Sequence, residues 1–350
     1  MKFRKFSTFF ISILLTTFSA IASDTEVDGI YYNFDSVNKT ASVTYKGDYY
    51  NSHDNEYSGD VIIPATVTYE GEEYKVIEIG HEAFENCDSL TCITISEGVT
   101  EIKEDAFYGC SSLTCITLHE GMIKIGRETF FECKSLTSIT LPQGLTEIGG
   151  WAFYGCSSLT DVTIPEGVTK IEEGTFSNCE FLTNVEIPKS ITTIGSAAFE
   201  YCSALTCITI PEGIEYIQSF AFWECKGLTY IISKSVTPPW CGNKVFYEVD
   251  KSTPIYVPMA SVDAYKSAKE WSEFTNIIGV DFEGNKTTVA DILADEFVVR
   301  FKENTLEVEG VADYEVYSTS GIKNFGKPER LDKGVYVVVA NGSSVKVMVK

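Results

Sequence analysis

Cysteines, histidines and clustered acids are the side chains of this chain that could do chemistry, and the cysteines are the most regularly spaced. Eleven cysteines occur, and seven of them stand 23 residues apart without a break. These are Cys87, Cys110, Cys133, Cys156, Cys179, Cys202 and Cys225. A thiol can form a disulfide, bind a metal or act as a nucleophile. A fixed period instead indicates one small structural unit that is repeated along the chain.

The residues around these cysteines repeat with the same period. Six copies of the unit L-T-x-I-T-I-P-x-G-V-T-x-I-x-x-x-A-F-x-x-C-x-S begin at Leu90, Leu113, Leu136, Leu159, Leu182 and Leu205. A longer, imperfect copy starts at Val61 and a decayed one at Leu228. One unit cannot bury its apolar side alone, so neighbouring copies must stack around a shared core. We therefore predict a right-handed solenoid.

Each unit is expected to form one coil. In L-x-x-I-x-I, positions one, four and six point inward and positions three and five outward, as in a short strand. Pro-x-Gly then ends the strand, because proline cannot donate to a ladder and glycine accepts a positive φ. A second extended stretch follows, and Ala-Phe and the cysteine close the coil. The phenylalanine ladder that should fill the centre is Phe84, Phe107, Phe130, Phe153, Phe176, Phe199 and Phe222.

This geometry argues against disulfides in the cysteine ladder. Its members point the same way on rungs about 4.8 Å apart, whereas a disulfide needs Cβ atoms about 3.8 Å apart. We expect buried free thiols that pack as small hydrophobic side chains. Cys92, Cys115 and Cys207 occupy the outward third position, and Cys241 lies in the C-terminal part. Cys92 and Cys115 are on adjacent rungs and could be forced together, but we expect them to stay separate.

Histidines and acids do not form a catalytic motif. The three histidines, His53, His81 and His119, belong to no H-E-x-x-H motif and no recognisable triad. His119 replaces a turn proline and is expected to be a solvated turn residue. Acid pairs such as Glu104-Asp105 and Glu172-Glu173 are expected on wet loops. The prediction is a protein that is not an enzyme and has no catalytic residue.

One group of oxygen-bearing residues has the ligand types of a metal site. It comprises Asp54, Asn55, Glu56 and Asp60, which could loosely hold calcium. Their spacing fits no calcium-loop motif. We therefore predict neither a metal nor a cofactor.

The net charge and the N-terminal residues indicate where the protein is located and which partners it excludes. Residues 1–22 combine three cations with an apolar run and end in Ala20-Ile21-Ala22, which predicts a signal peptide cut near Ala22. The formal charge of −23 would become −26 without those cations, so nucleic acid is an unlikely partner. No later run is long and apolar enough to span a membrane. The expected location is extracellular or the outer cell surface.

The remaining segments are expected to flank the solenoid in a mainly β protein. Residues 23–60 should form an N-terminal cap and 61–250 the solenoid. Residues 251–280 should form a C-terminal cap, with a last strand at Ile255–Pro258 after Pro238-Pro239-Trp240 stops the repeat, and one helix from Ser261 to Phe274. Residues 281–290 look like a linker. Residues 291–350 contain five strand-like runs, enough for a small β-sandwich.

Two solvated surfaces are candidates for binding. The outer strand face carries threonines at positions two and five of the repeat, although threonine ladders also serve as good strand formers. The second surface carries aromatic side chains at variable positions. These candidate ligand-binding residues are Tyr108, Phe131, Trp151, Tyr154, Phe220 and Trp223. Aromatic rings concentrate binding energy, but packing against the neighbouring coil is the alternative explanation.

The repeat, with its L-T-x-I-T-I-P-x-G and A-F-x-x-C, resembles the BspA-like leucine-rich-repeat family of bacterial surface proteins. Val61-Ile62-Ile63-Pro64, Val257-Pro258, Ala264-Tyr265 and Trp271 are similar to the caps of the Bacteroidota members. The resemblance covers roughly residues 28–280. It implies a secreted or cell-surface binding protein and brings no catalytic residues.

The C-terminal segment is similar to a type IX secretion sorting domain. The similarity rests on Tyr314–Gly321, Lys333–Val338 and the terminal Lys346–Lys350. The asparagine-proline opening usual in such domains is missing.

Together these features predict a secreted or cell-surface binding or adhesion protein. Its expected partner is an extracellular protein or glycan, such as a host matrix protein or another cell surface. The alternatives are a structural envelope component and a glycan-capture module with no adhesive role.

Overall fold

The structure is a computed structural model that describes residues 22–46, 57–280 and 282, and the backbone of six strands between residues 298 and 349. The predicted signal peptide up to residue 21, His53, Asp54–Glu56 and residues 283–290 of the predicted linker lie outside this range. Two compact units divide the chain at Cys156/Ser157, and each is described by itself. Within the described residues, no helix is both long enough and apolar enough to cross a bilayer.

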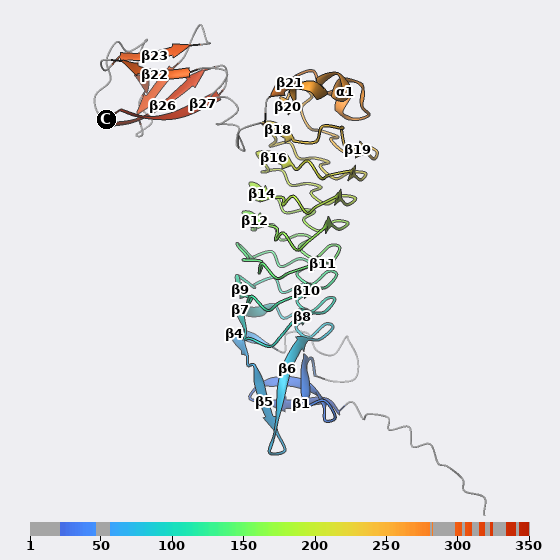
Figure 1. Cartoon of the computed structure of the whole chain (residues 1–350). Coiled ribbons are helices and arrows are strands. Elements are labelled where there is room, and N and C mark those ends of the chain that lie inside the picture. The colour runs from blue at the N-terminus through green and yellow to red at the C-terminus, as the bar shows by residue number, and fades with distance from the viewer. Residues whose placement is uncertain are drawn as a thin grey trace, which may run out of the picture. The chain divides into compact units, whose positions relative to one another are not determined.

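The first unit begins with antiparallel strands and continues as stacked coils (Figure 1). Its strands are β1 (Ala22–Val27), β2 (Ile30–Asp35), β3 (Thr40–Thr44), β4 (Ser58–Ile63), β5 (Thr66–Tyr69), β6 (Glu72–Ile79), β7 (Ser89–Ile95), β8 (Glu101–Ile102), β9 (Cys115–Thr117), β10 (Lys124–Ile125) and β11 (Glu147–Ile148). One sheet has the order β1-β2-β3-β6-β8-β10-β11, and β4, β7 and β9 form a second, parallel sheet. Each coil thus contributes to two faces.

The second unit repeats this plan with parallel pairs. Its coil strands are β12 (Asp161–Thr163), β13 (Lys170–Ile171), β14 (Asn184–Glu186), β15 (Thr193–Ile194), β16 (Cys207–Ile210), β17 (Tyr216–Ile217), β18 (Tyr230–Ser233), β19 (Trp240–Cys241), β20 (Ile255–Pro258) and β21 (Ile277–Val280). One sheet has the order β13-β15-β17-β19 and another β16-β18-β20-β21. Registers such as Lys124↔Glu147 and Thr193↔Tyr216 carry the 23-residue spacing. The predicted mainly β solenoid of 23-residue coils is confirmed.

The predicted phenylalanine ladder forms the core of both units. Every member is fully buried. In the first unit, ring centroids from Phe84 to Phe107, Phe130 and Phe153 are 4.9, 5.4 and 5.3 Å apart. In the second unit, Phe176, Phe199 and Phe222 follow at 5.5 and 5.4 Å. Each such burial is worth roughly 1.5–3 kcal/mol, so the ladder is a large part of what holds the coils together.

The C-terminal cap differs from its prediction. The helix expected from Ser261 to Phe274 is broken into a 3-10 turn at Met259–Ser261, α1 (Val262–Ser267) and a second 3-10 turn at Trp271–Glu273. The helix stops because Ala268 is extended and Glu270 has a positive φ of 68°. This reversal buries Trp271 against Phe246, 5.0 Å away.

The repeat also runs further than predicted. Pro238-Pro239-Trp240 was expected to stop it, but Trp240 begins β19, and Phe246 extends the ladder by stacking 5.5 Å from Phe222. Strand β20 is not the last, because β21 pairs with it in parallel. Conversely, residues 136–141 of the third regular copy form no strand.

Six further strands occupy the C-terminal part. They are β22 (Val298–Lys302), β23 (Thr305–Glu309), β24 (Glu315–Ser318), β25 (Lys323–Asn324), β26 (Gly334–Ala340) and β27 (Ser343–Val349). Antiparallel pairing gives one sheet of β22 and β23 and another of order β25-β24-β26-β27. All five predicted strand-like runs overlap these strands, and the sandwich itself stays a prediction.

Candidate binding surfaces

The aromatic residues predicted from sequence fall into two groups. In the first unit, Tyr108, Phe131 and Tyr154 stack face to face, with centroids 4.6 and 4.4 Å apart. Trp151 meets Tyr154 edge-on at 5.5 Å. All four side chains are half-buried. Each ring therefore gives part of its surface to neighbouring side chains and presents the rest to solvent.

The other two predicted residues belong to the second unit. Phe220 and Trp223 are half-buried and lie 5.0 Å apart. Tyr201 stacks on Trp223 at 6.1 Å, and Tyr247 meets it edge-on at 5.6 Å. Lys244 lies 5.7 and 5.0 Å from the ring centroids of Trp223 and Tyr247. Lys244 therefore covers part of the ring surface of this group through cation–π contacts.

The threonine face serves the fold first. At position two, the hydroxyl of Thr114 donates to the carbonyl of Thr91 at 3.0 Å, and that of Thr206 donates to Thr183 at 3.2 Å. These threonines therefore tie successive coils together. The position-five threonines stay exposed or half-buried on the outer strands.

The second unit also contains a pocket of about 670 Å³. Its lining consists of Glu212, Ile214, Glu215, Tyr216, Val236, Thr237, Pro238, Pro239 and Trp240. Tyr216, Val236 and Trp240 are 49%, 71% and 58% exposed. The rings of Tyr216 and Trp240 lie edge to face at 6.3 Å. Large rings that are this exposed are typical of contact sites, because burying them on a partner is strongly favourable.

The pocket arises where the coil is one residue longer. Thr193 pairs with Tyr216, 23 residues on, but Tyr216 pairs with Trp240, 24 residues on. The extra residue falls in Lys234–Pro239, the turn that replaces the shorter Pro211–Glu215 turn of the coil before. Pro238 and Pro239 stiffen this longer turn because proline fixes φ.

The C-terminal cap fixes the pocket wall. The indole N–H of Trp271 donates to the carbonyl of Pro239 at 3.1 Å. The hydroxyl of Tyr265 donates to Ser235 O at 2.9 Å, and the hydroxyl of Ser261 donates to Val236 O at 2.7 Å. Three cap side chains thus hold the backbone of the turn, so the pocket is preorganised.

Charged groups of both signs surround the two rings. Glu212 and Glu215 are exposed in the lining. Lys269 Nζ lies 5.8 Å from the Trp240 centroid and donates to Asn243 Oδ1 at 2.7 Å. Burial lowers the pKa of Lys234, with Lys189 acting in the same direction. The lining thus combines two aromatic rings and two prolines with the carboxylates of Glu212 and Glu215.

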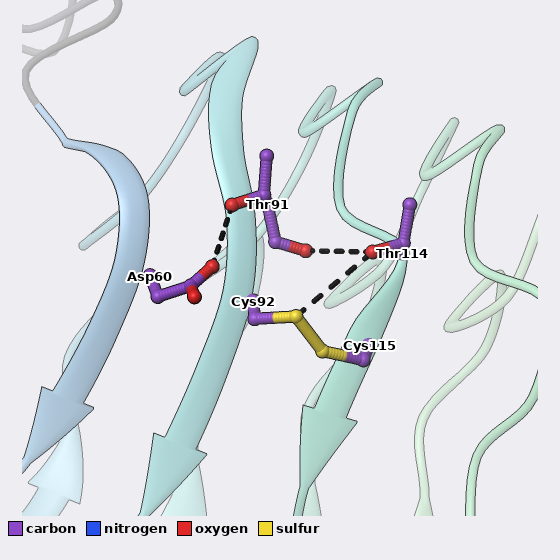
Figure 2. Close-up of a disulfide and its surroundings, with 5 residues drawn as sticks. All are labelled: Asp60, Thr91, Cys92, Thr114 and Cys115. Carbon is purple, nitrogen blue, oxygen red and sulfur yellow. Dashed lines mark hydrogen bonds between the residues drawn. A yellow bond between two sulfur atoms is a disulfide. The ribbon is translucent and has the colours of Figure 1, made fainter.

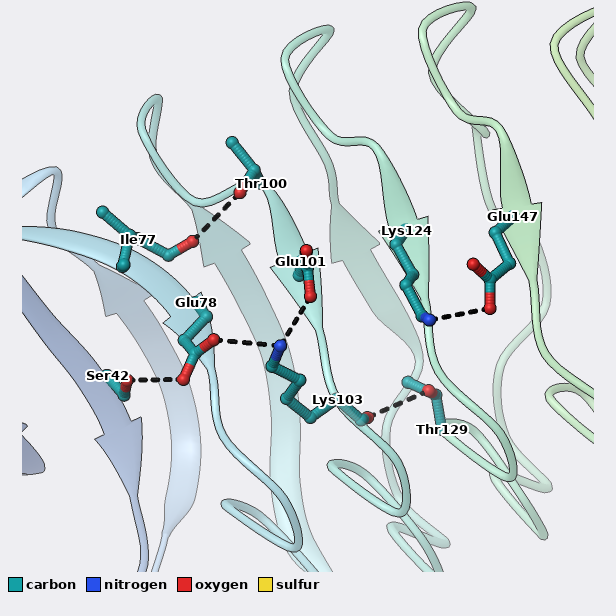
Figure 3. Close-up of polar contacts among 9 residues, drawn as sticks. All are labelled: Ser42, Ile77, Glu78, Thr100, Glu101, Lys103, Lys124, Thr129 and Glu147. Carbon is teal, nitrogen blue, oxygen red and sulfur yellow. Dashed lines mark hydrogen bonds and ion pairs between the residues drawn. The ribbon is translucent and has the colours of Figure 1, made fainter.

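The second face of the first unit is covered by ion pairs. Lys103 lies 3.1 Å from Glu78 and 2.5 Å from Glu101, and Lys124 lies 2.8 Å from Glu147 (Figure 3). These exposed pairs each contribute little to stability. At the position of Lys124 the next coils carry Glu147, Lys170, Thr193 and then Tyr216. An aromatic ring at a position otherwise polar was a signal for the pocket that the sequence reasoning missed.

Histidine and carboxylate groups converge at one place in the first unit. One donor atom each from His81, Glu82 and Asp105 lies within 4.8 Å of the others. His119, by contrast, is held as a turn residue, with its Nδ1 accepting from Gly121 N at 3.0 Å and its Nε2 lying 2.7 Å from Val99 O.

The expectation that Cys92 and Cys115 stay separate is wrong: they form a disulfide (Figure 2). They are paired partners on β7 and β9, with Cα atoms 4.9 Å apart, a separation common in disulfides. Third-position side chains face solvent, so no neighbouring packing prevents them from turning toward each other. The seven ladder cysteines, as predicted, are buried thiols that form no disulfide.

Comparisons with known proteins agree with the repeat. A family model described as BspA type leucine rich repeat region matches in six copies, over residues 72–183, 123–255 and 169–291. Together these ranges cover more than half of the chain. No curated protein matches the sequence.

Two solved structures are similar. A leucine rich cell surface protein from Faecalibacterium prausnitzii A2-165 is 37% identical, with a TM-score of 0.54 over 62% of this chain and 56% of that one. A leucine-rich repeat protein from Bacteroides ovatus ATCC 8483 is 34% identical, with a TM-score of 0.60 over 68% of this chain and 60% of that one. The chain therefore spans less than two thirds of either relative.

Proposed function

The chain belongs to the BspA-type leucine-rich-repeat family, and from this premise we propose that it is a non-catalytic surface protein that binds a partner protein. The observation that carries the proposal is the preorganised pocket with Tyr216 and Trp240 exposed. Rings of this kind supply most of the energy at protein interfaces. We name the surface lined by Tyr216, Val236, Pro238 and Trp240 the 216–240 pocket.

We further propose a location at the outer cell surface or outside the cell. A similar protein from Faecalibacterium prausnitzii is described as a cell surface protein, and residues 1–22 have the composition of a signal peptide. The C-terminal residues that resemble a sorting domain fit the same route. Adhesion to host matrix or to another cell is the specific role that these features favour.

The aromatic residues predicted from sequence form a second, weaker candidate surface. Tyr108, Phe131, Trp151 and Tyr154 present ring edges along successive coils, and Phe220 and Trp223 do so in the second unit. Their half-burial leaves less area for a partner than the rings of the 216–240 pocket have. We therefore rank the pocket first.

The test is a binding panel with the mature chain, residues 23–350. Purified extracellular-matrix proteins and a glycan array are the probes. Saturable binding to a matrix protein, recovered intact after incubation, supports the proposal. Binding confined to glycans would favour the glycan-capture alternative, and binding to neither would favour a structural envelope component. Turnover of a bound peptide or glycan, lost on replacing one acid or histidine, would overturn the non-catalytic assignment.

A further inference from the structure

The group formed by His81, Glu82 and Asp105 is built into equivalent positions of adjacent coils. Glu82 and Asp105 are 23 residues apart and both have left-handed backbone, with φ of 54° and 58°. Glu82 N donates to Glu104 O and Asp105 N to Arg127 O, at 3.2 and 3.0 Å. Their backbones are therefore fixed by bonds to the next coil.

The donor atoms of the three side chains face one another. His81 Nδ1 lies 3.4 Å from a carboxylate oxygen of Glu82, and Nε2 lies 3.8 Å from one of Asp105. Ligands around a tetrahedral Zn²⁺ ion at bond lengths of about 2.0–2.2 Å are about 3.3–3.6 Å apart. The three donor atoms lie within 4.8 Å of one another, which is slightly wider than that spacing.

The carboxylates of Glu82 and Asp105 form no ion pair with a lysine or arginine within the described residues. Glu128, at the same position one coil further on, pairs with Arg127 at 2.5 Å, and Glu104 also lies 3.7 Å from Arg127. Glu82 and Asp105 have only His81 as a cationic partner among the ion pairs of that range. In addition, Asp105 Oδ1 is buried and has no hydrogen-bond partner there. A buried oxygen without a partner is costly; the other carboxylate oxygen of Asp105, Oδ2, is the one that lies 3.8 Å from His81 Nε2.

We propose that His81, Glu82 and Asp105 bind a divalent transition-metal ion of the Zn²⁺ class. One imidazole nitrogen and two carboxylate oxygens form a donor set that suits Zn²⁺, whereas Ca²⁺ takes six to eight oxygens. His81 is 53% exposed, so the remaining coordination positions face solvent. Because the ligands come from two coils, the ion joins those coils and stabilises the folded state.

The experiment is calorimetric titration of the chelator-stripped mature chain with ZnCl₂, with CaCl₂ in parallel. We expect one saturable Zn²⁺ site per chain and no Ca²⁺ site of comparable affinity. His81→Ala and Asp105→Asn should each weaken Zn²⁺ binding at least about tenfold and abolish the rise in melting temperature on adding Zn²⁺. His119→Gln and Glu166→Gln are matched controls that remove a turn histidine and an exposed acid elsewhere, and they should bind as the wild type does.

A cobalt(II) spectrum identifies the donors independently. An imidazole–carboxylate set gives no strong sulfur-to-metal charge-transfer band, whereas binding at a cysteine such as Cys207 would. Absence of saturable Zn²⁺ binding, unchanged affinity in folded His81→Ala and Asp105→Asn, or a thiolate band would overturn the proposal. Circular dichroism establishes that each variant is folded.

Discussion

The ladder cysteines show which properties of a residue its spacing predicts and which it does not. Their period predicted that the ladder thiols are buried, but not that five of them donate to a backbone carbonyl. Cys110, for example, lies 2.9 Å from Phe84 O, and Cys225 lies 3.0 Å from Phe199 O. An S–H is a weak donor, and here it shares its carbonyl with a backbone N–H, since Phe84 O also accepts from Cys87 N and Phe199 O from Cys202 N. A one-dimensional pattern reports which way a side chain points and not what it touches.

These thiols should be inert in the folded protein. Burial raises the pKa of Cys110, Cys133 and Cys225 well above its usual range, which suppresses the reactive thiolate. We expect a thiol reagent at pH 8 to label the native chain at Cys207 at most, and to label nine thiols after unfolding without reductant. Reduction should add the two of the disulfide. Rapid native labelling of the ladder, or fewer than nine thiols on unfolding, would contradict the structure.

Asp105 makes stability depend on pH. Its pKa is raised to about 6, mainly by burial and then by the charges of Glu128 and Glu104. Since this exceeds the unfolded value of about 3.9, the folded state binds the proton more tightly. The stabilisation that comes from protonated Asp105 is therefore fully present below about pH 4, and it is lost as the pH rises through about 6.

We therefore expect Asp105→Asn, in the presence of a chelator, to raise the free energy of unfolding at pH 7.5 by up to about 1 kcal/mol. The difference should vanish near pH 4. Urea unfolding at the two pH values measures it, with Glu166→Gln as the control. A variant that is less stable than wild type at pH 7.5 would show that the Asp105 carboxylate is stabilising.

At the scale of elements, the disulfide joins β7 and β9 on the outer face. Closing a loop of 23 residues lowers the conformational entropy of the unfolded chain. This stabilises the folded state by roughly 3 kcal/mol. We expect the double variant Cys92→Ser/Cys115→Ser to lose about that much unfolding free energy in non-reducing urea titrations. Cys207→Ser, at the same repeat position but unpaired, should lose much less. Equal losses in the two variants would mean that the disulfide adds nothing.

The stability of the C-terminal cap depends on one tryptophan. Trp271 is fully buried, contacts Phe246 and Tyr265, and donates to Pro239. We expect Trp271→Ala to lower the free energy of unfolding by about 3–5 kcal/mol. Trp240→Ala, which removes an exposed tryptophan, should change it by less than about 1 kcal/mol. Thermal and urea unfolding of both variants compare them directly, and similar losses would place Trp240 in the core.

Strand positions were predictable and element ends were less so. Alternating apolar residues identified the inward face of each coil strand, because that pattern directly reflects burial. The helix at 261–274 was overestimated, since helical spacing of Tyr265 and Trp271 does not reveal the positive φ at Glu270. Strand β21 was missed because Ile277–Val280 is short and gains its stability from pairing with β20, a tertiary contact.

At the scale of the whole molecule, the repeat was enough to predict the fold but did not predict the binding site. A 23-residue unit copied six times allows few architectures, and stacking follows from burial alone. The 216–240 pocket depends instead on one inserted residue and on hydrogen bonds from the cap to its turn. Tyr216 stands out as an aromatic at a polar position, but Trp240 looked like the end of the repeat.

The central claim, that the protein binds a partner protein through the 216–240 pocket, is tested most directly by surface plasmon resonance. The mature chain, Trp240→Ala and Phe181→Ala are compared over the matrix protein that the binding panel selects. Phe181 is a matched control, because it is 63% exposed and lies outside the pocket. We predict that Trp240→Ala weakens binding by about 2 kcal/mol, roughly thirtyfold, at an unchanged melting temperature, and that Phe181→Ala binds as the wild type does. Wild-type affinity in Trp240→Ala, or an equal loss in Phe181→Ala, would contradict the account.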